Sequence, residues 1–244
     1  MRPDVSVVVP FCRRPEISRT LAALAADPDR PALDVIVVEC GPRDAGTASR
    51  VLAERPPPRW IDAGRRHFNK PYAVNVGVHQ AVAGTVLLLD ADVLVGPGFL
   101  AAAANTVRPG LMCVLGGVAE ARHPGRFRPA PGILMCSARD YRAVGGMSSD
   151  LHGWGFDDID LIMRLRISGV VLRRMGQGTH LTHGDDRRDV PQGMTKEQSD
   201  ARNRVLAYTR MARGQISGTY EHDVARWRGR QGGTRCASSG TWGS

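Results

Sequence analysis

The chain has 244 residues, of which 42% are apolar and 23% charged, and its formal net charge is +9. This length fits one large domain with a substantial core, and the composition is that of an ordinary globular protein. No apolar run approaches the ~20 residues that cross a bilayer, and the N-terminus lacks the apolar core of a signal peptide. All but two of the 33 basic residues are arginines, but they are dispersed and aromatic residues are few. The basic charge therefore does not indicate a nucleic-acid-binding protein.

Five cysteines are scattered along the chain without a C-x-x-C pair. An odd number at irregular spacing is typical of reduced thiols, and it argues against a disulfide framework or a zinc knuckle. We therefore expect a cytoplasmic protein. A basic, amphipathic helical pattern near the C-terminus allows at most a peripheral contact with an anionic membrane.

Apolar, β-branched runs alternate with helical patterns through the first half of the chain. Strands are predicted over residues 4–10, 34–39, 60–62, 85–89 and 111–115, and helices over 15–24, 47–54, 71–82 and 98–106. Such alternation predicts an α/β fold with a doubly wound, mostly parallel sheet flanked by helices. A sheet of this kind has a nucleotide-type crevice outside the carboxyl ends of its strands.

The second half of the chain has longer irregular segments. Loops are predicted over residues 120–131 and 176–189, strands over 133–137 and 170–173, and helices over 138–144, 157–168 and 195–213.

One domain is expected over residues 1–214, with its two halves over 1–118 and 119–214. The basic, Gly/Ser-rich segment 215–244 is predicted to be a flexible tail.

Two carboxylates, Asp90 and Asp92, follow the most apolar predicted strand, Thr85–Leu89. A strand that is apolar on both faces belongs in the middle of a covered sheet, so these acids are expected at its ligand-binding edge. Paired oxygen ligands there suit a hard divalent cation that also holds phosphate oxygens. The alternative is a polar strand end that turns into a loop.

Two stretches could bind phosphate. Pro10–Arg14, PFCRR, ends the first strand, where an aromatic ring could pack against a base and guanidinium groups could reach phosphates. Phe68–Gly77, FNKPYAVNVG, precedes a helix whose N-terminus favours anions. The alternatives are a strand-ending turn with solvated arginines and a helix cap formed by Asn69 and Pro71.

Two later stretches could carry chemistry. His152–Asp160, HGWGFDDID, places a tryptophan between glycines directly before the acids Asp157 and Asp158, for which helix capping is the alternative. His180–His183, HLTH, could place two imidazoles on one metal, and the alternative is a pair of surface histidines.

The five stretches PFCRR, FNKPYAVNVG, DAD, GWGFDD and HLTH resemble motifs of GT-A glycosyltransferases of the family 2 kind, and within them the β-1,4-galactosyltransferase-like group. Their order is the same, over residues 5–200. The resemblance implies a GT-A fold, a nucleotide-sugar donor, and a manganese ion with magnesium as the alternative. It also implies that residues 1–118 are the nucleotide-sugar half and residues 119–214 the acceptor-side, catalytic half. This chain departs from the motifs at Cys12 and Lys70, which replace arginines, and at Phe156, which replaces a glycine.

The resemblance also implies a role for each matching residue. Donor binding is implied for Pro10, Phe11, Arg14, Glu39, Phe68, Lys70, Asp90, Asp92, Trp154 and Gly155. Metal ligation is implied for Asp92, His180 and His183. The catalytic residues are Asp158, expected to be the base, and Asp157, expected to bind the acceptor. Glu39 stands where the wider family has an acidic pair that recognises uracil.

The implied activity is a metal-dependent, inverting transfer of a sugar from a nucleotide diphosphate donor, expected to be a UDP-sugar, to an acceptor hydroxyl. Expelling a diphosphate needs its charge neutralised, and a carboxylate must take the acceptor's proton. The acceptor could be a saccharide, a peptide, a lipid or a small molecule.

Two other functions stay open. One is a non-catalytic nucleotide- or carbohydrate-binding module. The other is a sugar nucleotidyltransferase, which would need a Gly-rich phosphate loop after the first strand, where PFCRR has no glycine.

Overall fold

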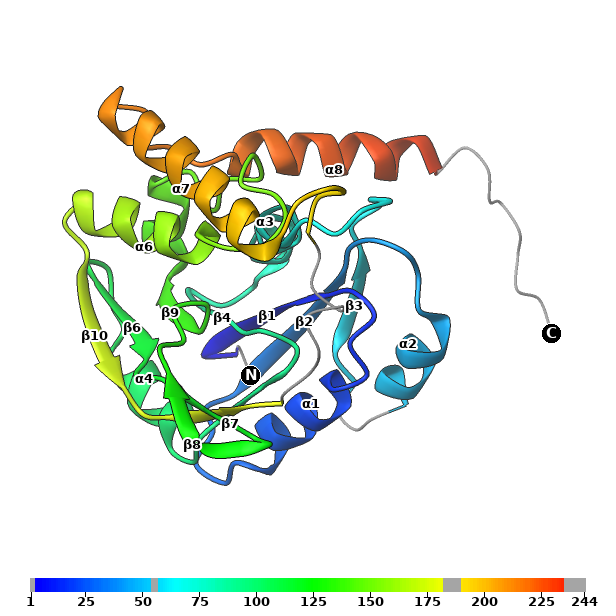
Figure 1. The fold of residues 1–244 in the computed structure, drawn as a ribbon. Coiled ribbons are helices and arrows are strands. Elements are labelled where there is room, and N and C mark those ends of the chain that lie inside the picture. The colour runs from blue at the N-terminus through cyan, green and yellow to red at the C-terminus, as the bar shows by residue number, and fades with distance from the viewer. Residues whose placement is uncertain (1–2, 54–56, 182–189, 235–244) are drawn as a thin grey trace.

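A seven-stranded sheet forms the centre of the computed structural model, which describes residues 3–53, 57–181 and 190–234 (Figure 1). Its strand order is β10-β6-β9-β4-β1-β2-β3. The strands are β1 (Val5–Phe11), β2 (Leu33–Glu39), β3 (Arg59–Asp62), β4 (Thr85–Leu88), β6 (Leu111–Leu115), β9 (Leu134–Ser137) and β10 (Val171–Met175). Strand β9 runs antiparallel to β4 and β6, and the other pairs are parallel. The predicted α/β fold with a mostly parallel sheet is confirmed.

Helices cover both faces of this sheet, because successive side chains of each buried strand point to opposite faces. In β1, Val8 belongs to one apolar cluster, whereas Val7 and Val9 belong to the other. The first cluster packs against α3 (Lys70–Gln80), α5 (Ala138–Ala143), α6 (Asp157–Ile167) and α8 (Tyr220–Thr234). The second packs against α1 (Ile17–Ala26), α2 (Ala45–Leu52) and α4 (Phe99–Thr106). Strand β4, with Val86–Leu88 buried, lies near the middle, as the sequence predicts.

A second, four-stranded sheet stands where the sequence predicts loops. Its order is β5-β11-β7-β8, formed by β5 (Val93–Val95), β11 (Gly178–His180), β7 (Val118–Glu120) and β8 (His123–Arg128). The predicted loops at 120–131 and 176–189 are thus wrong for β8 and β11. Three of these strands have three residues each and pair with distant segments, so no local hydrophobic pattern marks them.

Residues 220–234 form the helix α8, although the sequence predicts a flexible tail from residue 215. Tyr220, Val224 and Trp227 lie at i, i+4 and i+7 and pack into the core cluster. Helix α8 lies beside α3 (Figure 1). The Gly/Ser-rich composition of the following residues hides this short amphipathic pattern. Residues 235–244 lie outside the described part of the chain, and the boundaries at 118 and 214 stay predictions. Among the described helices, none has both the length and the apolarity of a membrane span.

A buried carboxylate ties α8 to the rest of the fold. Asp223 is 1% exposed and accepts hydrogen bonds from Asn75 Nδ2 (2.7 Å), Ser149 Oγ (2.8 Å) and Thr219 Oγ1 (2.8 Å). Asn75, on α3, also holds the main chain of Met147. The segment before the tryptophan turn is therefore fixed to α3 and α8 at the same time.

Replacing Asp223 by alanine should lower the free energy of unfolding by about 3 kcal/mol, because one buried and two partly buried donors lose a charged acceptor. The matched control is Glu221→Ala, an exposed acid on the same helix, which should change it by less than about 0.5 kcal/mol. Urea unfolding monitored by circular dichroism measures both values. Equal, small losses in the two variants would show that α8 is not an integral part of the fold.

Candidate active site

A cavity of about 470 Å³ opens at the carboxyl end of the large sheet, next to the small one. Most of the residues predicted from the motifs line it: Pro10, Arg14, Phe68, Lys70, Asp90, Asp92, Trp154, Gly155, Asp157, Asp158 and His180. These residues come from the ends of β1 and β4, the start of α3, the start of α6 and the end of β11. The fold therefore brings four separate motifs and the D-x-D pair to one place.

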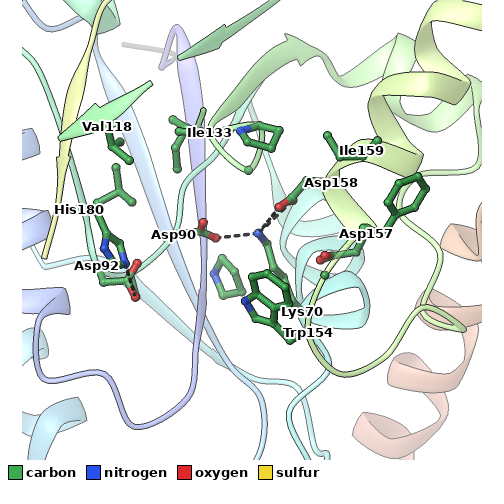
Figure 2. A pocket seen from close by; sticks show the side chains of 18 of the residues that line it. Lys70, Asp90, Asp92, Val118, Ile133, Trp154, Asp157, Asp158, Ile159 and His180 are labelled. Atoms are coloured by element: carbon green, nitrogen blue, oxygen red, sulfur yellow. Dashed lines mark hydrogen bonds and ion pairs between the residues drawn. The ribbon is translucent and has the colours of Figure 1, made fainter. Parts of the chain in front are cut away.

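Asp92 and His180 form one wall of the cavity (Figure 2). Strand β11 pairs antiparallel with β5, so His180 stands opposite Val93, and the Leu181 N–H donates to the Asp92 carbonyl at 2.7 Å. This register leaves His180 Nε2 3.9 Å from Asp92 Oδ2. Arg14 Nε approaches the same carboxylate oxygen at 3.8 Å.

The Asp92 and His180 pair is suited to a divalent cation. One imidazole nitrogen and one carboxylate oxygen 3.9 Å apart can both reach an ion placed about 2.1 Å from each. A carboxylate, Glu120, lies 2.7 Å from the other imidazole nitrogen, Nδ1, as is usual for a ligating histidine. The described residues hold no group of three or more His, Cys, Asp and Glu side chains arranged for a metal. The third predicted ligand, His183, lies outside the described residues.

Lys70 occupies the middle of the cavity between two acids (Figure 2). Its Nζ lies 2.8 Å from Asp90 Oδ1 and 3.0 Å from Asp158 Oδ1. Burial alone would lower the pKa of Lys70, but the carboxylates of Asp158 and Asp90 raise it well above its ordinary value, so Lys70 stays charged. A Cβ on Gly132 would stand 2.8 Å from an Asp158 oxygen and 2.9 Å from an Asp90 oxygen, so a larger residue at this position would displace these carboxylates.

Asp157 and Asp158 form the opposite wall, at the N-terminus of α6 (Figure 2). Burial, followed by the charge of Asp158, raises the pKa of Asp157 to about 7. Burial also raises the pKa of Asp158, although Lys70 opposes this effect. Both acids thus have raised pKa values, which suits groups that accept a proton during a reaction.

The third acid of this helix has a structural role. Asp160 accepts from both Arg164 Nε (2.9 Å) and Nη2 (2.7 Å), and both side chains are buried. Arg164 in turn donates to the carbonyls of Val144 and Gly146. Asp160 is therefore held by Arg164 and does not line the cavity.

The turn that carries Trp154 is held by α7 (Lys196–Ala212). Ser199 Oγ accepts from the Trp154 N–H at 3.0 Å, and Asn203 Nδ2 donates to the Gly155 carbonyl at 2.9 Å. The next residue, Phe156, adopts a left-handed conformation with φ of 66°, which costs a bulky residue about 1–2 kcal/mol. Its ring lies 5.4 Å from that of Tyr208 on α7. Strain of this size at the rim of a cavity is a frequent feature of functional sites.

The structure does not bring two of the predicted donor-binding residues to the cavity. Phe11 lies on the same face of β1 as Val7 and Val9, so its ring is fully buried and packs against Trp60 with centroids 5.1 Å apart. Glu39 is 5% exposed, and its oxygens accept from the Asp44 N–H (2.8 Å) and Trp60 Nε1 (3.3 Å). Its carboxylate therefore closes the turn after β2.

Sequence reasoning missed several residues at or behind the cavity wall, namely Glu120, Arg128, Gly132 and Asp200. The first three come from the small sheet and the loop after it, which have no motif. Asp200 lies in the predicted helix 195–213, but nothing in the local pattern indicates that it reaches the cavity.

Solved structures share this fold at low sequence identity. The catalytic domain of Drosophila β-1,4-galactosyltransferase 7 in complex with xylobiose is 20% identical, with a TM-score of 0.53, over 79% of this chain and 77% of that one. A mutant of the same enzyme with manganese, UDP-Gal and xylobiose is 18% identical, with a TM-score of 0.55, over 80% and 78%. A mannosyltransferase from Pyrobaculum calidifontis in complex with GDP-Man and Mn²⁺ is 17% identical, with a TM-score of 0.63, over 98% and 77%.

Two family models match the sequence. The model described as "Glycosyltransferase like family 2" matches residues 3–153, more than half of the chain, and the model described as "N-terminal domain of galactosyltransferase" matches residues 126–184. No curated protein matches it by sequence. The first match spans the strands of the large sheet except β10 and ends at the tryptophan turn, and the second spans the acid pair, β10 and β11. The chain therefore belongs to the family 2-like glycosyltransferases, and it is a GT-A enzyme that resembles the β-1,4-galactosyltransferase group.

Proposed function

We propose that this glycosyltransferase moves a sugar, with inversion, from a nucleotide diphosphate donor to an acceptor hydroxyl, and that it uses a divalent cation. The observation that carries the proposal is the arrangement of the cavity. Asp92 and His180 stand on one wall, and Asp157 and Asp158 stand on the other, with Lys70 between them (Figure 2). Inversion needs this arrangement, because the leaving group and the attacking hydroxyl lie on opposite sides of the anomeric carbon.

The donor side is the wall of Asp92 and His180. These two residues, with His183 as a third ligand, would hold the cation, and mixed nitrogen and oxygen ligands favour manganese over magnesium. A cation bound there neutralises charge on a leaving diphosphate. UDP-sugar is the proposed donor, which the UDP-Gal in one structural neighbour supports. Arg14, which lines the same wall, adds a second positive charge beside the phosphates.

The acceptor side is the wall of Asp157 and Asp158. The acceptor hydroxyl would attack the anomeric carbon while its proton passes to Asp158, and the bond between that carbon and the diphosphate oxygen breaks. Asp157 would bind the acceptor. Lys70 lies 3.0 Å from Asp158, so it orients this carboxylate, and it would also face the diphosphate from the opposite direction to the cation. A carbohydrate acceptor is supported by the xylobiose in two structural neighbours.

Two substitutions distinguish the role of the acceptor wall from that of the donor wall. Asp158→Asn should lower kcat by about 100-fold or more, because the base is lost, while the Kd for UDP with Mn²⁺ changes little. Asp92→Ala should instead weaken Mn²⁺-dependent UDP binding by about tenfold or more. The exposed Asp29→Asn serves as the control. Nucleotide release from a panel of sugar nucleotides and acceptors, together with UDP calorimetry, measures both effects. An Asp158→Asn variant that keeps most of its turnover would refute the assignment of Asp158 as the base.

The acid pair should produce a pH dependence. Burial raises the pKa of Asp157 to about 7, and its ionised form is the one expected to bind the acceptor hydroxyl, so kcat/KM should rise with pH up to about 7 and then level off. Asp157→Asn removes the group that titrates there, so this inflection should disappear. A pH–rate profile of both proteins tests this. An inflection that stays in place in Asp157→Asn would show that another group causes it.

The ring of Phe156 should contribute to acceptor binding, since it replaces a glycine beside the acids. Phe156→Gly and Phe156→Ala both remove the ring, but alanine keeps the unfavourable φ of 66°, so the glycine variant should be more stable by about 1 kcal/mol. If the ring contacts the acceptor, both variants should raise the acceptor KM equally while donor hydrolysis by water is unchanged. Steady-state kinetics and thermal melts measure these values. An unchanged acceptor KM in both variants would leave the ring only a packing role against Tyr208.

A further inference from the structure

Glu120 lies behind the donor wall, at the end of β7. Strand β11 pairs parallel with β7, which sets His180 directly opposite Glu120. Glu120 is 8% exposed, and its Oε2 lies 2.7 Å from His180 Nδ1. Its other oxygen, Oε1, accepts from Arg128 Nε at 2.7 Å. The carboxylate is thus held on both sides in a buried position.

This contact decides which imidazole nitrogen of His180 carries the proton. An ionised carboxylate can only accept hydrogen bonds, so Nδ1 must be the donor. In the neutral ring the lone pair then lies on Nε2, and that nitrogen is the one 3.9 Å from Asp92 Oδ2. The ring cannot turn over without losing the buried contact to Glu120.

We propose that Glu120 is a positioning residue for the divalent cation, which it serves by fixing the tautomer and the orientation of His180. The inference rests on the cation in the proposed function, but it concerns a residue that no motif includes. A carboxylate behind a ligating histidine also makes the imidazole a stronger ligand. The small sheet positions both contacts of His180. The pairing of β11 with β7 aligns His180 with Glu120, and the pairing of β11 with β5 places it beside Asp92.

A purely structural role for Glu120 predicts a different outcome. If it only pairs with the buried imidazole of His180 and with the partly exposed Arg128, its removal lowers stability and leaves cation affinity unchanged. If it positions His180, its removal weakens cation binding even where the protein stays folded. Cation affinity and thermal stability therefore distinguish the two roles.

The test is a Mn²⁺ titration of the full chain, followed by electron paramagnetic resonance, with and without UDP. Glu120→Ala should weaken Mn²⁺ binding by about 10–100-fold. Glu120→Gln keeps the volume and one acceptor oxygen, so its loss should lie at the tenfold end, and it serves if the alanine variant fails to fold. In a His180→Ala background, Glu120→Ala should cause no further loss, because its effect passes through the imidazole.

A second measurement does not need the metal. A ¹H–¹⁵N spectrum of the histidine side chains, with His180→Ala for assignment, should show the Nδ1–H tautomer in the wild type and a mixture in Glu120→Gln. Unchanged Mn²⁺ affinity in both Glu120 variants, or losses that add to that of His180→Ala, would overturn the inference. If Asp92→Ala and His180→Ala weaken Mn²⁺ binding in the same series, the proposed function stands while the inference fails. A wild type that binds no Mn²⁺ would overturn both.

Discussion

The register of β11 between β5 and β7 is the constraint on which the site depends. Asp92 follows the most buried region of the large sheet, and His180 comes almost 90 residues later, so no local preference joins them. The antiparallel pairing of His180 with Val93 brings the two side chains to one wall. A shift by one residue would turn the imidazole to the other face of the strand. The small sheet, which carries little of the apolar core, therefore positions the donor wall.

The ammonium group of Lys70 links distant parts of the chain. Lys70 begins α3 in the first half, and it contacts Asp90 after β4 and Asp158 on α6, 88 residues away. Without that charge, three neighbouring carboxylates would repel one another in a poorly hydrated place. With it, the repulsion is reduced, although burial still raises the pKa of both Asp157 and Asp158, and Asp158 is held by the ion pair. A diphosphate entering the cavity would compete with the carboxylates for the same ammonium group.

Much of the fold and site could be predicted from sequence where a local pattern exists. The buried strand before Asp90, the Asn69 cap of α3 and the start of α6 at Asp157 all agree with the structure. The small sheet could not be predicted, because its short strands are stabilised by partners distant in sequence. For the same reason no local pattern marks Glu120, because the residue that it contacts lies 60 positions away. Phe11 matches a motif and Glu39 stands where the family has an acidic pair, but the alternation of β1 and the turn after β2 direct their side chains elsewhere.

The most direct measurement of the central claim is a crystal structure of the full chain with Mn²⁺ and UDP, with anomalous data collected at the manganese edge. We expect one anomalous manganese peak within about 2.3 Å of both Asp92 Oδ2 and His180 Nε2, with the diphosphate beside it and Asp158 on the opposite wall. A peak on Asp157 and Asp158 instead, or bound UDP with no manganese near His180, would contradict it.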